Sequence, residues 1–150
     1  MTTPTPTTPD YADVVARSFA RQGIMTLIGA RLGRVEPGHV TISVPFSPAV
    51  GQQQGLFHGG VIGAIGDSAG GYAALTLMPA GSEVVTVEYK INFVRPAAGR
   101  LLVAEGRVLR AGKSVTVGRI DVEVEDEAGA RTLIAAIQAT FMRVAGSPGA

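Results

Sequence analysis

Asp67 is the residue of this 150-residue chain that is best placed to do chemistry. It is the one carboxylate in a nearly apolar, glycine-rich segment that runs from His58 to Met78. An unpaired carboxylate that leaves water loses much of its solvation free energy or takes up a proton. A chain that carries such a group in an apolar segment usually has a functional use for it. We therefore expect Asp67 to be a functional residue.

The neighbours of Asp67 on its expected helix face are all small. They follow one another at steps of three and four residues: Gly60, Ala64, Gly71 and Ala74. Such a face would let a ligand or another backbone approach the carboxylate. The alternative is a solvated Asp67 on an exposed stripe, but each helical glycine costs about 1 kcal/mol relative to alanine without benefit there. A bulkier adjacent face is expected to meet a sheet: Val61, Ile65, Ser68, Tyr72 and Leu75.

The start of the same segment, His58-Gly59-Gly60, is a second candidate site. The first N–H groups of a helix have no intrahelical acceptor and lie at the positive end of the helix dipole. They can hold a carbonyl oxygen that becomes an oxyanion, although a tight turn explains two glycines equally well. Gly59 and Asp67 are about 12 Å apart along a helix. If both act on one substrate, two subunits must place these helices antiparallel about a two-fold axis.

The elements that position these residues follow from the apolar spacing. A first helix capped by Asp10 is expected over residues 11–23, then strands over 24–35 and 40–46, and a loop over 47–57. After the apolar helix, four strands are expected at 85–93, 101–110, 113–125 and 131–144. The apolar phase of the third slips at Gly118, which predicts a β-bulge. Six mostly antiparallel strands and one central helix make an α+β architecture.

Composition narrows the classes of function. The formal net charge of +1 indicates neither nucleic acid nor an anionic membrane as a partner. The chain has no cysteine and only two histidines, His39 and His58, so we expect no metal and no redox cofactor. The central carboxylate and six glycines make the apolar helix a poor membrane span.

The ends of the chain predict its organisation. Residues 1–9 are rich in threonine and proline and predict a disordered leader, followed by a single domain over residues 10–145. The leader has no basic residue and no apolar run, so it is not expected to be an export signal. The expected compartment is therefore the cytoplasm.

The segment Gly55-Leu-Phe-His58-Gly59-Gly60, with Asp67 nine residues after the histidine, resembles the PaaI-type hotdog-fold acyl-CoA thioesterases. The stretch Thr86-Val-Glu-Tyr-Lys-Ile-Asn-Phe-Val-Arg-Pro96 resembles the strand after that family's central helix. The similarity covers roughly residues 24–144. It implies a hotdog fold, in which an antiparallel sheet of about six strands wraps around the central helix, with a short N-terminal helix.

The resemblance also implies an activity and an assembly. The activity is hydrolysis of an acyl-CoA thioester to the free acid and CoA, with CoA as part of the substrate and no separate cofactor. The assembly is a homodimer, often paired into a homotetramer, with its sites at the subunit interface. This agrees with the distance between Gly59 and Asp67 along the helix.

By the same resemblance, Asp67 is the nucleophile or the general base, and the Gly59 N–H polarises the thioester carbonyl. Gln52 supplies an assisting side-chain amide, at a position where many members carry asparagine, and Thr86 helps to orient water. His58 is expected to fix the loop beside the substrate rather than to react.

Substrate contacts are also expected from Gly60 and from cations that hold the CoA phosphates. Four cations lie near turns: Arg95, Arg100, Arg110 and Lys113. Arg95 and Lys113 are our candidates for this role.

Two other functions stay open. A hydratase or dehydratase on the same fold would pair an aspartate with a downstream histidine, and no histidine follows Asp67. A non-catalytic acyl-CoA-binding module would share the fold and the pocket, so only activity separates it from a hydrolase. The acyl group and the choice between dimer and tetramer are not specified by these motifs.

Overall fold

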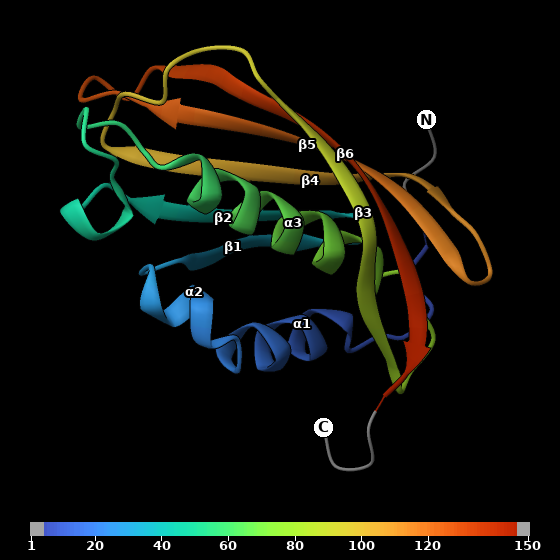
Figure 1. The fold of residues 1–150 in the computed structure, drawn as a ribbon. Coiled ribbons are helices and arrows are strands. Elements are labelled where there is room, and N and C mark those ends of the chain that lie inside the picture. The colour runs from blue at the N-terminus through green and yellow to red at the C-terminus, as the bar shows by residue number, and fades with distance from the viewer. Residues whose placement is uncertain (1–4, 147–150) are drawn as a thin grey trace.

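An antiparallel sheet of six strands curves around one long helix, α3 (Gly59–Leu75), in the computed structural model, which describes residues 5–146 (Figure 1). The strands are β1 (Arg31–Glu36), β2 (His39–Pro45), β3 (Ser82–Phe93), β4 (Leu101–Ala111), β5 (Val115–Glu125) and β6 (Arg131–Ala145). Two short helices, α1 (Tyr11–Ala20) and α2 (Gly23–Leu27), precede β1, and a 3-10 turn (Pro48–Val50) precedes α3. The predicted hotdog arrangement is confirmed.

The order of strands across the sheet places β3 at an edge. The order is β1-β2-β4-β5-β6-β3, and every neighbouring pair is antiparallel. β3 pairs with β6 along eleven residue pairs, from Ser82 to Phe93, and has no partner on its other side within the sheet. The strand that directly follows the central helix therefore has a free backbone edge.

Close contact between α3 and the sheet explains several of the glycines. A Cβ atom on Gly106 of β4 would lie 2.5 Å from the backbone carbonyl of Ala69. On the helix, a Cβ atom on Gly66 would lie 2.4 Å from Ile137, and one on Gly70 would lie 2.7 Å from Phe141. The contact at Gly106 is with backbone atoms, so this glycine sets how near the helix lies to the sheet, whereas at Gly66 and Gly70 side chains of the sheet would have to shift.

The strand expected over residues 24–35 is wrong in its first half. Gly23–Leu27 form the helix α2, and β1 begins only at Arg31. Met25 is the buried residue of this short helix, whereas Leu27 is 81% exposed. Gly29, with φ of +70°, then turns the chain into β1. Asp10 does precede α1, but its side chain makes no capping hydrogen bond.

The β-bulge predicted at Gly118 lies on the partner strand instead. Val108 pairs with Gly118 and Arg110 pairs with Val117, so the extra residue is Leu109 of β4. The buried residues of β5 keep one phase through this point: Thr116, Gly118, Ile120, Val122 and Val124. Val115, which is 42% exposed, and Val117 lie in the other phase, on the outer face. The apolar slip in the sequence therefore marks apolar residues outside the core.

The expectations about a membrane span, the leader and the domain bounds can be compared with the structure only in part. Across residues 5–146, no helix is long and apolar enough to cross a membrane. Residues 1–4 of the predicted leader lie outside the described residues, and the side chain of Thr7 donates a hydrogen bond to the carbonyl of Met78. The domain bounds, 10–145, stay a prediction.

Candidate active site

Asp67 lies midway along α3 and is half-buried beside the edge strand. Thr86 Oγ1 on β3 donates a hydrogen bond of 2.7 Å to Asp67 Oδ1. A β-bulge at Val87 follows directly, and bulges commonly redirect side chains near active sites. Among the described residues, the Thr86 hydroxyl is the sole hydrogen-bond donor to this carboxylate. Asp67 Oδ2 is therefore available to a water molecule or a substrate.

A pocket of about 260 Å³ opens at this pair, and we call it the Asp67 pocket. Besides Asp67 and Thr86, its polar lining consists of Gln22 and Ser68. Its remaining lining is mostly apolar: Ile24, Met25, Ala64, Gly71, Tyr72 and Val84. A mostly apolar pocket that ends on a few polar groups is typical of a small-molecule site.

The small-residue face around Asp67 is open only in its first half. Gly60 is exposed and Ala64 half-buried, whereas Gly71 and Ala74 are buried. The bulkier face that was expected to meet the sheet contacts helix α1 in part. Its residues Ser68 and Tyr72 hydrogen-bond to side chains at the end of α1 and just beyond it.

The start of α3 leaves one backbone donor free. The His58 side chain is the N-cap, because its Nδ1 accepts the Gly60 N–H at 2.9 Å. The His58 carbonyl accepts the N–H groups of Val61 and Ile62. The structure records no acceptor for the Gly59 N–H within residues 5–146. Of the two glycines, only Gly59 therefore offers an unpaired donor at the positive end of the helix.

Gln52 is held by the backbone of the loop before α3. Its N–H donates to the Leu56 carbonyl at 2.8 Å, and its carbonyl accepts the N–H of Gly55 at 3.0 Å. Gly51 and Phe57 pair across the same loop, which brings Gln52 near the start of α3. In the part of the chain that the structure describes, the Gln52 side-chain amide has no hydrogen-bond partner, so it can act on a ligand.

Helix α3 and strand β3 lie side by side and hold the two candidate groups apart. Asp67 faces Thr86, while a Cβ atom on Gly59 would lie 3.3 Å from the Phe93 ring. Because α3 is continuous from Gly59 to Leu75, Gly59 and Asp67 are about 12 Å apart along its axis. One chain therefore cannot bring both to the same carbonyl group.

The two candidate cations lie at opposite ends of the sheet. Arg95 Nη1 donates to the Leu133 carbonyl at 3.1 Å, near the start of β6. Lys113 lies in the turn between β4 and β5, next to Ser114, whose carbonyl accepts the N–H of Arg143 near the end of β6. Ten residues of strand span about 30 Å. One chain therefore does not bring Arg95 and Lys113 to one phosphate group.

The other arginines near turns and the second histidine do not line the Asp67 pocket. Arg100 forms an ion pair with Glu125, so its charge is already engaged, and Arg110 is exposed near the end of β4. The second histidine, His39, contacts Glu105 at 2.7 Å on strands β2 and β4. Over residues 5–146, no three side chains of the metal-ligating types cluster as a metal site.

Gln22, Ile24 and Met25 were not foreseen as site residues. They lie at the junction of α1 and α2, where the sequence pattern placed Gln22 near the end of the first helix and Ile24 and Met25 at the start of a strand. Ile24 and Ile28 lie four residues apart with Met25 buried beside them, but a spacing within one helical turn does not distinguish a helix from a strand.

Comparison with known proteins assigns the chain to a family. The family model of the thioesterase superfamily matches residues 54–131, which include the His58-Gly59-Gly60 loop, Asp67 and Thr86. The chain belongs to the thioesterase superfamily. As members of this family do, the protein hydrolyses thioesters. Gln52 lies two residues before the matched region.

Relatives of this thioesterase extend over most of the chain. A Saccharolobus solfataricus protein with a provisional esterase name is 34% identical over 106 residues, which cover 71% of this chain and 74% of its own. The medium/long-chain acyl-CoA thioesterase YigI of Salmonella typhimurium is 28% identical over 130 residues, which cover 77% and 81%.

Solved structures show the same fold. A thioesterase family protein from Silicibacter pomeroyi has a TM-score of 0.88 and 38% identity to this thioesterase, and the match covers 91% of this chain and 99% of the other. The Escherichia coli PaaI protein from the phenylacetic acid degradation operon has a TM-score of 0.79 at 19% identity, over 92% and 96% of the two chains. The PaaI-type hotdog fold expected from the sequence is confirmed.

Proposed function

We propose that this thioesterase hydrolyses acyl-CoA thioesters to free acid and CoA, with Asp67 as general base or nucleophile. The observation that carries the proposal is the hydrogen bond from Thr86 to Asp67 in the lining of a mostly apolar pocket. One carboxylate oxygen is held and the other is free for chemistry, while the apolar lining suits an acyl group. The acyl-CoA substrate is supported by the name of the relative YigI.

The reaction needs one proton transfer and one oxyanion site. As a base, Asp67 takes a proton from water while the water oxygen forms a bond to the thioester carbon. The carbonyl oxygen becomes an oxyanion, which the Gly59 N–H and the Gln52 amide stabilise. The carbon–sulfur bond then breaks, and the proton passes from Asp67 to the CoA thiolate. As a nucleophile, Asp67 would bond to the thioester carbon and the carbon–sulfur bond would break, which releases the CoA thiolate and leaves an anhydride. Water would then hydrolyse the anhydride to the free acid and Asp67, and the proton released goes to the thiolate.

We further propose that each site combines two copies of the chain. Asp67 and Gly59 of one chain are too far apart, so the oxyanion donor would come from the partner. The free edge of β3 supports this arrangement, because it carries exposed apolar side chains: Val85, Val87, Tyr89 and Phe93. An unpaired apolar edge is a template for another strand. Pairing of β3 with its copy would bring the two α3 helices together.

The remaining site residues take supporting roles in this proposal. By capping α3 through Gly60, His58 holds the Gly59 N–H in place beside the substrate. Arg95 and Lys113 would bind the CoA phosphates, and they could approach one CoA only from different subunits. No metal or redox cofactor enters the reaction as proposed, and self-association is as a homodimer or homotetramer in the cytoplasm.

A hydratase or dehydratase is the alternative on this fold. Its aspartate would need a partner histidine, but His39 is engaged with Glu105 and His58 caps α3. The geometry around Asp67 therefore favours hydrolysis.

The test is a panel of aliphatic and aromatic acyl-CoA esters assayed with the wild type and with Asp67→Asn. Loss of a general base lowers kcat by about 10²- to 10⁴-fold. Asp13→Asn, on the exposed side of α1, is the matched control and should keep wild-type rates. An Asp67→Asn enzyme within a few-fold of wild type would refute the assigned role of Asp67.

A further inference from the structure

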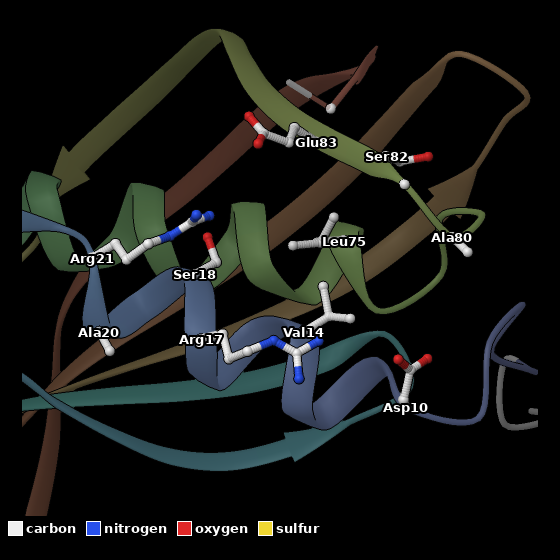
Figure 2. A pocket seen from close by; sticks show the side chains of 12 residues that line it. Asp10, Val14, Arg17, Ser18, Ala20, Arg21, Leu75, Ala80, Ser82 and Glu83 are labelled. Atoms are coloured by element: carbon white, nitrogen blue, oxygen red, sulfur yellow. The ribbon is translucent and has the colours of Figure 1, made fainter. Parts of the chain in front are cut away.

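A second pocket, of about 660 Å³, lies beside helix α1, and we call it the distal pocket (Figure 2). Val14, Ser18 and Arg21 of the α1 region line one side, Leu75 of α3 forms the floor, and Glu83 of β3 lines the other side. None of the site residues described above belongs to this pocket.

The distal pocket and the Asp67 pocket are neighbours, and each is lined by residues of the α1 region, α3 and β3. On α3, Tyr72 lines the Asp67 pocket and Leu75 lines the distal pocket. On β3, Val84 and Glu83 are divided in the same way, and the α1 side passes from Gln22 to Ser18. In each of the three elements, residues close together in the sequence therefore divide between the two pockets.

A bridge of hydrogen-bonded side chains separates the two pockets. Gln22 Nε2 donates to Tyr72 Oη at 2.7 Å, and Ser18 Oγ lies 3.2 Å from the same oxygen. Gln22 Oε1 accepts from Ser68 Oγ at 3.2 Å, so both ends of the Gln22 amide are engaged. The Phe19 ring packs edge-on against Tyr72, which is only 3% exposed. The bridge is thus held from α1 and from α3.

We propose that this bridge of Ser18, Gln22 and Tyr72 sets the upper length of the acyl chain, and that the distal pocket receives the end of a longer chain when the bridge opens. The inference rests on the proposed function, because it places the acyl group in the Asp67 pocket. The Asp67 pocket is the smaller of the two, about 260 Å³ against about 660 Å³ for the distal pocket. We expect a medium-length chain such as octanoyl to stay in the Asp67 pocket and a palmitoyl chain to need the space beyond the bridge.

The charges of the distal pocket suit a hydrocarbon chain better than the CoA phosphates. Arg17 and Arg21 face the same pocket as Asp10 and Glu83, so two cations are balanced by two carboxylates. The negatively charged CoA phosphates would bind preferentially to a pocket with excess positive charge. The floor between these charges is apolar, as Figure 2 shows for Val14 and Leu75.

The test compares rates along a series of straight-chain acyl-CoA esters from butyryl to palmitoyl, each below its micelle-forming concentration. For the wild type, we expect kcat/KM to fall by about tenfold or more from octanoyl-CoA to palmitoyl-CoA, because the bridge blocks the methylene groups that extend beyond the Asp67 pocket. Gln22→Ala removes the centre of the bridge and should raise the ratio of palmitoyl to octanoyl kcat/KM by about tenfold.

Two further variants keep the test decisive. Tyr72→Phe retains the buried ring but loses the hydroxyl that Ser18 and Gln22 contact, so it should shift the ratio in the same direction by a smaller factor. Gln138→Ala, on the exposed outer face of β6, is the matched control and should keep the wild-type ratio. Should Gln22→Ala fail to fold, Tyr72→Phe carries the test alone.

The possible failures are distinguishable. A wild type that hydrolyses palmitoyl-CoA as fast as octanoyl-CoA, or an unchanged ratio in both bridge variants, would overturn this inference and leave the proposed function intact. A wild type that hydrolyses no acyl-CoA, aromatic esters included, would overturn the proposed function and this inference with it.

Discussion

Thr86 and Asp67 join the free edge strand to the middle of the central helix through a hydrogen bond of 2.7 Å. The catalytic candidate is therefore tied to the same strand that is open for pairing. A second copy that covers β3 would also enclose the carboxylate. Assembly and formation of the active site would then be one event.

Removal of the Thr86 hydroxyl should lower the rate without abolishing it. A hydrogen bond to a charged group contributes about 1.5–3 kcal/mol, so we expect Thr86→Val to lower kcat by about tenfold to a hundredfold, with a smaller effect on KM. Thr140→Val is the control, because it loses a similar bond, to Glu88, away from the pocket. Equal losses in the two variants, measured by steady-state kinetics, would show that the Thr86 bond has no special role.

The N–H of Gly59 can be removed by a proline substitution with little other change to the helix. Proline is favoured at the first position of a helix and lacks an N–H, and the extended backbone of His58, with ψ of 137°, suits the residue before a proline. Since an oxyanion donor contributes about 10²- to 10³-fold to kcat, we expect Gly59→Pro to lose about that factor.

Gly59→Ala is the matched control for that experiment. It adds the same Cβ atom, 3.3 Å from the Phe93 ring, but keeps the donor. We expect it to keep most of the wild-type kcat, while circular dichroism checks that both variants fold. A Gly59→Ala enzyme as slow as Gly59→Pro would indicate that crowding at Phe93, rather than the N–H, explains the loss.

Gly106 should be essential for stability. A Cβ atom there would lie 2.5 Å from the backbone of Ala69, which cannot move without shifting α3. Because overpacking costs about 1–3 kcal/mol, we expect Gly106→Ala to lower the free energy of unfolding by about 2 kcal/mol or more. Gly23→Ala, where no atom lies within 4 Å, should leave it nearly unchanged. Urea denaturation at one protein concentration compares the two, and equal midpoints would contradict the packing argument.

The central helix and the place of Asp67 on it could be predicted because their sequence pattern is strong. One carboxylate in a long apolar segment marks Asp67, and the spacing from Gly59 follows from helix geometry alone. Thr86 could be assigned only by resemblance, since its contact with Asp67 joins residues far apart in the sequence. The individual roles of these residues stay predictions.

The α1–α2 corner could not be predicted because a single helical turn has too few residues to show its period. Ile24 to Ile28 form a short apolar run that fits a strand equally well. The bridge from Gln22 to Tyr72 joins residues that are 50 positions apart in the sequence, so no local pattern could predict it. The bulge was misplaced for a different reason. Val115 is apolar but exposed, and an apolar pattern cannot tell an outer face from a core.

Complementation between two inactive variants tests the shared site most directly. Asp67→Asn and Gly59→Pro chains are coexpressed in equal amounts and their thioesterase rate is measured. If each site takes Asp67 from one chain and Gly59 from another, random association restores about a quarter of the sites, in dimers and tetramers alike. We predict about a quarter of the wild-type rate, well above either variant alone. A mixture no more active than its components would contradict the shared site.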